Sequence, residues 1–336
     1  MHLNRFLLSA ACVVFLLSYQ ANAQYLHFTQ NSFVPVTVNP AQAGLFEGTY
    51  RVGGLLRSQY QTGGFKGYQT PVIFVDVPIK GLRKQDWIGI GLNLHRDAAG
   101  SAILTNTLVA GNVSYHIGLN KRQTSVFSVG VQVGYNQRNI DRGKLVFGDA
   151  LLKGGSSADQ PLIDDNNKTF TPINIGVNLK GLANKTTSYN IGLSLDNILK
   201  AKYNLLTSTP SSLTSQINMY GTIDMVVRKK YVVSPAGFIR YNSGGLNIMG
   251  QTTVGMVIDS KKNIVPRIGA GYRIGDAAQL LIGMDYGDFR VGGAFDYTLN
   301  KLAQTSTNNG FEIAVGYIGK IFKSNKPPKV ILCPQY

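Results

Sequence analysis

The chain has 336 residues, of which 15% are charged, 10% are aromatic and 38 are glycine, and its formal net charge is +16. Soluble globular proteins usually carry about 25% charged residues, and beyond the first residues no stretch approaches the roughly 20 apolar residues that a transmembrane helix needs. Both classes are therefore disfavoured. Low charge with many glycines and tyrosines is typical instead of a transmembrane β-barrel, whose strands present one face to lipid and the other to a polar lumen.

The first residues carry the features of a cleavable secretion signal. Arg5 is the only charged residue before residue 47, the apolar run 6–17 follows it, and Ala21-Asn22-Ala23 has the small-x-small pattern at which signal peptidase cuts. A membrane anchor is the alternative, but the apolar run is shorter than the roughly 20 residues that span a bilayer. We therefore predict a signal peptide over residues 1–23, with the mature chain beginning at Gln24.

Residues 24–49 precede the first predicted strand and lack the regular pattern of the rest of the mature chain. They contain Asn39, Pro40, Ala41 and Gly44 in the run Asn-Pro-Ala-Gln-Ala-Gly. Asn-Pro followed by a glycine is turn chemistry, because proline fixes φ and removes a hydrogen-bond donor. A segment as apolar as this, placed before a barrel, is predicted to fold back into the lumen as a plug.

From residue 50 onward apolar residues alternate with small or polar residues, which is the period of a β-strand with two different faces. The clearest examples are 126–136, 173–180, 189–196 and 289–300. Each run is close to the roughly 10 residues that a tilted strand needs to cross a bilayer, whereas strands of soluble sandwiches usually have about 5–6. Strands are predicted at 50–60, 69–78, 86–95, 105–116, 124–136, 171–180, 187–196, 215–228, 231–241, 246–258, 262–274, 277–286, 288–299 and 310–321.

The predicted fold class is therefore all-β, a transmembrane antiparallel β-barrel of about 14 strands with an N-terminal lumenal or periplasmic segment. In chain order we expect the signal peptide at 1–23, the plug-like segment at 24–49, the outer-membrane barrel at 50–322 and a basic periplasmic tail at 323–336. Many strands end in a tyrosine or tryptophan, where an aromatic girdle is expected. The protein is accordingly predicted to be integral to the outer membrane of a Gram-negative bacterium.

The lengths of the connections between the predicted strands give an independent check on this assignment of strands. If both ends of the barrel lie in the periplasm, alternate connections are extracellular, and these are normally the longer ones. The long gaps 137–170, 196–215 and 300–309 all fall on the extracellular side, and the short segments 228–230 and 259–262 fall on the periplasmic side. A miscount by one strand between them would break this agreement.

Positive charge gathers on the predicted periplasmic side. The candidate contacts for a periplasmic partner are the basic residues Lys80, Arg83, Lys84, Lys121, Arg122, Arg228, Lys229, Lys230, Lys261 and Lys262. A face of this kind attracts an acidic partner, and basic turns that only contact lipid phosphates are the alternative. Nucleic acid is not expected as a partner, because an exported membrane barrel does not normally meet it.

Charged residues also occupy positions predicted to face the lumen. They are Arg57, Arg267, Arg273, Asp285, Arg290, Asp296 and Glu312. Ion pairs that fill a narrow interior are one interpretation, and a conduction path is the other.

Candidate catalytic or metal-binding groups are sparse. Cys12 lies in the signal, which leaves Cys333 alone in the mature chain and excludes an intrachain disulfide or a cysteine-based metal site. The histidines of the mature chain are His27, His95 and His116, and no H-E-x-x-H, G-x-S-x-G or P-loop pattern occurs. We therefore expect no enzyme, no cofactor and no metal.

Motifs at the two ends of the mature chain match a known family. At the amino end they are Gln24 to Phe33 and the run from Asn39 to Gly44. At the carboxy end they are Phe295-Asp296-Tyr297, Ser306 to Ile313, Gly316-Tyr317, Cys333-Pro334 and the terminal Tyr336. With these motifs the chain resembles the PorP/SprF family of outer-membrane proteins associated with the type IX secretion system.

The resemblance implies a non-enzymatic barrel of the secretion and gliding machinery, which binds a cognate secreted protein such as an adhesin or helps to export and retain it. It also implies partners among periplasmic and peptidoglycan-associated components of the machine, besides the secreted substrate and outer-membrane lipid. The loops 137–170 and 196–215 are the expected substrate contacts. The alternative is a FadL-like transporter of hydrophobic small molecules, whose amino-terminal plug can also carry an Asn-Pro-Ala sequence.

Overall fold

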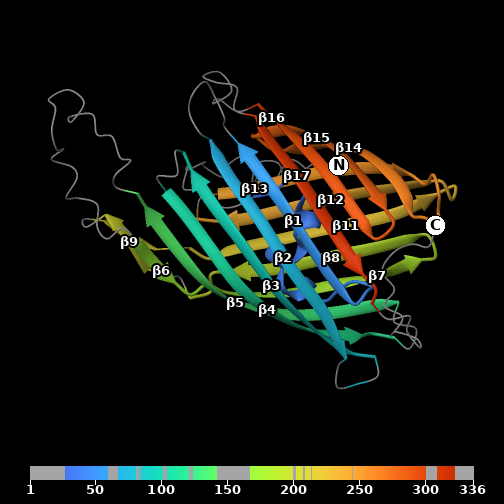
Figure 1. Ribbon diagram of the computed structural model, residues 1–336, viewed down its shortest axis with the longest axis horizontal. Coiled ribbons are helices and arrows are strands. Elements are labelled where there is room, and N and C mark those ends of the chain that lie inside the picture. Colours follow the sequence, from blue (N-terminus) through green and yellow to red (C-terminus); the bar gives the residue numbers. More distant parts are fainter. Residues whose placement is uncertain are drawn as a thin grey trace, which may run out of the picture.

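Strands that run side by side and close on themselves form the body of the protein, as the computed structural model shows (Figure 1). The predicted signal peptide, the predicted tail and Cys333 lie outside the residues that the structure describes. The described residues are 27–59, 67–80, 83, 85–100, 104–120, 124–141, 167–199, 202–206, 209–212, 214–243, 245–299 and 309–321.

Within these residues, fourteen long antiparallel strands form the wall of the barrel. They are β1 (Tyr50–Gln59), β2 (Tyr68–Lys80), β3 (Trp87–Ala99), β4 (Leu104–Gly118), β5 (Ser125–Ile140), β7 (Ile173–Asn184), β8 (Thr187–Asp196), β11 (Gln216–Val227), β12 (Tyr231–Asn242), β13 (Gly245–Met256), β14 (Ile264–Arg273), β15 (Ala277–Tyr286), β16 (Phe289–Thr298) and β17 (Gly310–Gly319). β1 pairs along its whole length with β17, and the pairing of β4 with β5 completes the ring. The predicted all-β barrel is therefore confirmed.

Successive side chains of each strand point to opposite faces of the wall. In β15, Leu280 and Ile282 are 53% and 60% exposed, whereas Leu281 between them is only 6% exposed. In β16, Val291 and Phe295 are exposed on the outside, as the alternation predicts. Large apolar side chains thus cover the outer surface, which is what contact with lipid hydrocarbon requires.

The two ends of the barrel differ in the lengths of their connections. We call the end at which β1 begins and β17 ends the turn end, and the opposite end the loop end. Short connections such as 185–186, 228–230 and 287–288 join strands at the turn end, whereas 141–172 and 197–215 join strands at the loop end. The prediction that the longest connections all fall at one end of the barrel is therefore confirmed.

Three short strands lie in regions that were predicted to be loops. β6 (Asn167–Phe170) pairs with the loop end of β5, and β9 (Lys202–Leu206) pairs with β10 (Thr209–Ser212) in a separate two-stranded sheet. β5 extends beyond its pairing with β7 and would otherwise leave backbone groups unpaired along that edge, which β6 satisfies. Strands outside a membrane need no regular apolar face, so the alternation on which the prediction relied is missing there.

Three predicted strands also ended four residues too early. β3, β5 and β7 continue to Ala99, Ile140 and Asn184, whereas the predictions stopped at residues 95, 136 and 180. The added part of β3 includes Arg96 and Asp97, which are polar on both faces of the strand, although the hydrogen-bonded pairing with β4 continues. The apolar alternation therefore marks the part of a strand that lies in lipid, and the pairing itself reaches further.

Residues 27–49 form short helical turns inside the barrel, and we call them the lumenal segment. The turns are η1 (Asn31–Phe33), α2 (Pro35–Val38) and η2 (Pro40–Gln42), and the strands enclose them (Figure 1). η1 contacts β1 and β17, α2 contacts β2 and β3, and η2 contacts β4, β5 and β7. Because these strands belong to different sides of the wall, the lumenal segment extends across the interior. None of the helices in the described ranges has the length and apolar character needed to cross a membrane.

Arginine substitutions on the two faces of the wall test this assignment. Ile282→Arg places a charge on the outside of β15 and is expected to lower the free energy of unfolding by about 2–4 kcal/mol, the cost of arginine near the middle of the hydrocarbon layer. The control Thr253→Arg lies on the lumenal face of β13 and is expected to cost less than half as much. Urea titration of the barrel folded into lipid vesicles measures both, and equal losses would contradict the assignment.

Candidate functional site

Asn39 joins the lumenal segment to the part of the wall that β7, β8 and β11 form. Its fully buried side-chain amide nitrogen donates to the carbonyl oxygen of Val177 at 3.0 Å and to the hydroxyl of Tyr220 at 3.1 Å. Its side-chain oxygen accepts from the backbone N–H of Ala41 at 2.8 Å. An aspartate offers no donor for the first two bonds, so the geometry explains why asparagine occupies this position.

Gly44 lies where the lumenal segment touches the opposite side of the wall. Its φ is +68°, and a Cβ on it would lie 2.6 Å from the Cα of Gly89. Its N–H donates to Asp76 at 2.6 Å, and its carbonyl oxygen accepts from the indole N–H of Trp87 at 2.9 Å. Asp76 also pairs with Arg51 at 2.7 Å. Only glycine fits here, because the backbone is left-handed and the wall approaches it too closely for a side chain.

Ala43 presents its carbonyl oxygen to two side chains of β4. The hydroxyl of Ser114 donates to it at 2.6 Å, and Nε2 of His116 lies 2.7 Å from it. Because a carbonyl oxygen only accepts, the geometry places the hydrogen of the imidazole on Nε2. Nδ1 of His116 lies 2.7 Å from the hydroxyl of Ser128. His116 therefore has a structural role, which is to attach the lumenal segment to β4.

The amino end of the lumenal segment is held by a different part of the wall. The hydroxyl of Thr29 donates to Asp296 at 2.7 Å and accepts from Arg273 and Gln279, each at 3.0 Å. The backbone N–H groups of Thr29 and Gln30 donate to the two carboxylate oxygens of Glu312 at 2.8 and 2.9 Å. Hydrogen bonds to ionised groups are the stronger kind in proteins, so Thr29 is firmly fixed.

The four charged residues around Thr29 neutralise one another, and we call them the charged cluster. Arg57 pairs with Asp296 at 3.0 Å and with Glu312, and Arg273 pairs with Asp296 at 3.2 Å. Their side chains are at most 4% exposed. Charges buried to this extent are retained only when they are paired and hydrogen-bonded.

The three other charges predicted to face the lumen also pair. Arg267 lies 2.8 Å and Arg290 lies 3.4 Å from Asp285. All seven residues therefore form ion pairs, as the first interpretation expected, but the partners lie within one run of adjacent strands, from β14 to β1, and not on opposite sides of the interior. This pairing supports the structural interpretation over the conduction path.

Apolar packing fills the space between these polar anchors. Phe28, Val34 and Val38 of the lumenal segment belong to one buried cluster with inward side chains from several strands. The strand residues of this cluster are Leu55, Val72, Phe74, Tyr220, Phe238, Met249 and Ala314. The lumenal segment is thus packed into the wall and does not rest loosely in a water-filled pore.

The predicted docking residues that the structure describes lie at the turn end, where they form what we call the basic rim. Its members, all exposed, are Arg83, Arg228, Lys229, Lys230, Lys261 and Lys262. Lys84, Lys121 and Arg122 lie outside the described residues, and of Lys80 only the backbone is described. The rim is a property of one end of the barrel, since every connection that contributes to it joins strands at the turn end.

Local backbone geometry presents the charges of the basic rim to solvent. In the turn between β11 and β12, Arg228 and Lys229 have φ of 53° and 56°, which is the left-handed region. In the turn between β13 and β14, the carboxylate of Asp259 accepts from the backbone N–H groups of Lys261 and Lys262 at 2.8 and 3.1 Å. The Asp259 carboxylate therefore holds the backbone of the turn, while both lysine side chains remain exposed.

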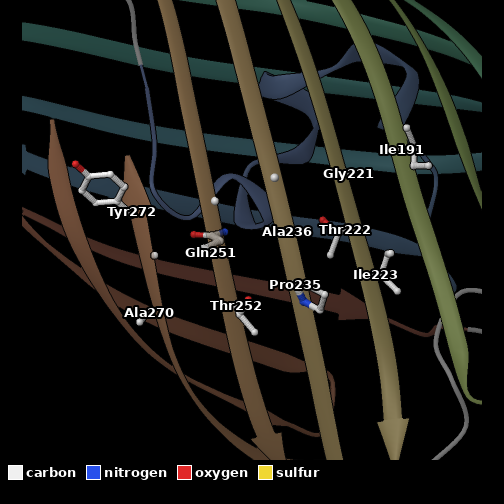
Figure 2. Close-up of a pocket in the computed structure, with 13 residues that line it drawn as sticks. Ile191, Gly221, Thr222, Ile223, Pro235, Ala236, Gln251, Thr252, Ala270 and Tyr272 are labelled. Atoms are coloured by element: carbon white, nitrogen blue, oxygen red, sulfur yellow. The ribbon is translucent and has the colours of Figure 1, made fainter. Parts of the chain in front are cut away.

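A groove of about 770 Å³ lies in the wall that β8, β11, β12, β13 and β14 form (Figure 2). Most of its lining residues occupy outward positions of the alternating strands, so it opens on the lipid-facing side. They are Ile191, Gly221, Ile223, Pro235, Gly237, Gly250, Thr252, Ala270 and Tyr272. The sequence did not lead us to predict this groove, although the glycines at outward positions of the strands could have indicated it.

Sequence reasoning also found the motif of the lumenal segment without its partners. Asp76, Trp87, Ser114 and Tyr220 lie on four different strands and belong to no motif. The available signal was a polar residue at an inward position of an alternating strand, such as Asp76 after Val72 and Phe74 in β2. That signal marks a lumenal position, but it does not say which segment occupies the lumen.

Comparisons with known proteins extend these observations. The family model described as "Type IX secretion system membrane protein PorP/SprF" matches residues 19–317. The toluene transporter TodX of Pseudomonas putida is 10% identical, with 90% of this chain and 95% of that chain covered and a TM-score of 0.50. The toluene transporter TbuX of Ralstonia pickettii is 12% identical, with 85% and 92% covered and a TM-score of 0.51. At these identities the likeness shows the barrel fold alone. The comparison with curated proteins found no match.

Alanine at two glycines tests the close approach of Gly44 to the wall. Gly44 and Gly275 both have positive φ, 68° and 71°, so either alanine incurs the strain of left-handed backbone, about 1–2 kcal/mol. A Cβ at Gly44 also collides with Gly89, whereas nothing lies within 4 Å of a Cβ at Gly275. We expect Gly44→Ala to lower the free energy of unfolding clearly more than Gly275→Ala in urea titrations. Equal losses would mean that the close approach does not matter.

Glu312→Gln tests the hold of the charged cluster on Thr29 and Gln30. A neutral amide of the same shape accepts hydrogen bonds more weakly than a carboxylate, whose bonds contribute about 1.5–3 kcal/mol each. We therefore expect hydrogen exchange at the two amides to accelerate by about tenfold or more, measured by mass spectrometry of the barrel in detergent. Ser32→Ala, at an exposed position of the same segment, should leave exchange unchanged. Unaltered exchange in Glu312→Gln would rule out this anchor.

Proposed function

The chain belongs to the family of type IX secretion system membrane proteins PorP/SprF, and from this membership we propose that it is a partner-binding barrel of the secretion machinery. It is an integral protein of the outer membrane. In the proposed role it holds a cognate secreted protein, such as an adhesin, at the cell surface while its other end engages periplasmic components of the machine. The observation that carries this proposal is the exposed basic rim at one end of the barrel.

The turn end is the end that we propose to face the periplasm. Bacterial barrels have short periplasmic turns and longer extracellular loops, and the longest connections of this barrel all lie at the opposite, loop end. Exposed cations on three connections at the same end of the barrel create a positive potential that attracts and orients an acidic surface. A peptidoglycan-associated or periplasmic protein with an acidic face is the partner that this rim fits.

We propose that the lumenal segment stays in the barrel as a fixed plug. Its amino end bonds to the charged cluster, whereas Asn39 and Gly44 bond to other parts of the wall. Release would leave the charges of the cluster without their backbone partners and would expose a buried apolar cluster, both of which are costly. On this account a cargo protein binds to the ends of the barrel and does not thread through its lumen.

The loop end is the proposed site of contact with the cargo. The long connections 141–172 and 197–215 join strands there, and they include the short strands β6, β9 and β10. Strand edges outside the membrane are surfaces on which an extended segment of another protein can pair. Cargo binding at the loop end and machine binding at the basic rim then occupy opposite sides of the membrane.

A FadL-like transporter of hydrophobic small molecules is the second candidate. The shared fold with the toluene transporters TodX and TbuX favours it, at the level of fold alone. A transporter needs a path that an apolar ligand can follow, but the described part of the lumen holds the packed lumenal segment and buried ion pairs. We therefore rank the partner-binding barrel first.

Charge reversal in the turn between β11 and β12 tests docking at the basic rim. The triple variant Arg228→Asp, Lys229→Asp, Lys230→Glu uses aspartate at the two positions of positive φ, where aspartate is better tolerated than most residues. We expect recovery of periplasmic partners with the tagged protein from detergent-solubilised outer membranes to fall about tenfold or more, because like charges across an interface repel strongly. Quantitative mass spectrometry of the co-purified proteins measures the recovery.

The matched control keeps the charge of the same turn. Arg228→Lys, Lys229→Arg, Lys230→Arg should recover partners as well as the unaltered protein does. If the reversed variant also recovers them fully, the turn does not dock a partner, and contact with lipid phosphates is then its remaining role. Recovery of the unaltered barrel alone, with bound fatty acid, would favour the transporter.

A further inference from the structure

The floor of the outer groove is a row of glycines. Gly221, Gly237 and Gly250 are register partners in the neighbouring strands β11, β12 and β13, so they lie at one level across the wall. Ile191 pairs with Gly221 at one end of the row, and Tyr272 pairs with Gly250 at the other. In Figure 2, Ile191 and Tyr272 lie on opposite sides of the labelled residues. The groove is therefore elongated across the strands.

Rows of large apolar side chains border the groove on its two long sides. The row toward the loop end consists of Met219, Ile239 and Ile248, which are register partners. The row toward the turn end consists of Met225, Val233, Val254 and Ile268, which are also register partners. Between these rows lie the glycine floor and, on its turn-end side, Ile223, Pro235, Thr252 and Ala270, of which only Ile223 is large. The groove is thus a trench with apolar walls in an otherwise raised surface.

The trench lies in the hydrocarbon layer of the membrane. Tyr231 and Tyr241 are exposed residues at the two ends of β12, and Pro235 and Gly237 lie midway between them on the same outward face. Ten residues of strand span about 33 Å, which at the usual tilt matches the apolar band of about 25 Å between the aromatic girdles of such barrels. The molecules that meet the trench are consequently the acyl chains of the bilayer.

The shape of the trench selects among possible occupants. From β8 to β14 it crosses five neighbouring strands, about 19 Å at the usual strand spacing. The slot directly over the glycines is narrower than the distance between the two rows. Its flanking residues along each strand are four apart, about 13 Å before their side chains narrow the gap, and they are Met219 and Ile223, Ile239 and Pro235, and Ile248 and Thr252. A transmembrane helix, about 10–12 Å wide with its side chains, does not reach the glycine floor, and the convex wall of a second barrel does not either.

We propose that the trench is a binding site for one acyl chain of an outer-membrane lipid. A single hydrocarbon chain is narrow enough to lie on Gly221, Gly237 and Gly250 and long enough to extend between Ile191 and Tyr272. Contact with the glycine floor and with the side chains that flank it on both sides gives this chain more buried surface than a chain beside the raised wall, so it exchanges more slowly with the bulk lipid. The site is separate from the basic rim and does not depend on the proposed function.

Filling the trench with side chains tests the proposal. A Cβ at Gly237 or Gly250 has nothing within 4 Å, so in the variant Gly237→Leu, Gly250→Leu both side chains start in open space and extend into the trench. The probe is phosphatidylethanolamine with a diazirine in the middle of one acyl chain, in vesicles that hold the folded barrel. After irradiation, we expect crosslinks in the unaltered protein to gather on Ile191, Pro235, Thr252 and Tyr272. In the filled variant they should fall about tenfold, because the displaced chain loses its buried contacts.

The matched control places a leucine at another lipid-facing glycine. Gly111 lies at an outward position of β4, where a Cβ would meet only Leu92 at 3.9 Å, so Gly111→Leu should leave crosslinking at the trench unchanged. Retention of the folded form in SDS shows that each variant is intact. Crosslinks spread evenly over the outer wall of the unaltered protein would overturn the proposal, as would equal crosslinking in the filled variant. Crosslinking of two barrels through the trench residues would also overturn it, in favour of a second copy.

Discussion

Closure of the ring between β1 and β17 is the contact on which the other features of this protein depend. Hydrocarbon offers no water to an unpaired N–H or C=O group, so a sheet persists in a membrane only if it has no free edge. Ten register pairs, from Tyr50–Gly319 to Gln59–Gly310, join the first strand to the last. Once the ring is closed, each strand has one face toward lipid and one toward an enclosed interior, and the face on which a side chain lies determines the chemistry that it needs.

The interior then imposes a second constraint, because polar groups that are removed from water need partners. Arg57 and Glu312 belong to the strands that close the ring, and together with Arg273 and Asp296 they bind the amino end of the lumenal segment. Asn39 and Gly44 satisfy the same requirement elsewhere in the interior. The segment and the wall therefore complete one another, which is why we regard the ends of the barrel as its binding surfaces.

Much of the fold was predictable because a membrane strand carries its own signal. The alternation in 126–136 and 289–300 states both the secondary structure and the two faces, and an inward charge such as Asp296 has to pair. The predictions were wrong where that constraint ends. β6, β9 and β10 lie in the connections at the loop end, and the end of β3 carries Arg96 and Asp97, so no apolar period marks them. The candidate docking residues were read from connection length and charge, and the structure places those that it describes at one end.

The sequence by itself determined the strand number, the outward and inward faces, the lumenal charges and the run from Asn39 to Gly44, because each depends on local periodicity or on residue type. Only the tertiary structure decided which groups meet. Gly44 is specific because Gly89 and Asp76 approach it, and Gly237 contributes to a groove because Gly221 and Gly250 stand beside it in register. Such pairings join residues far apart in the chain, and they exist only after closure of the ring fixes the register of every strand.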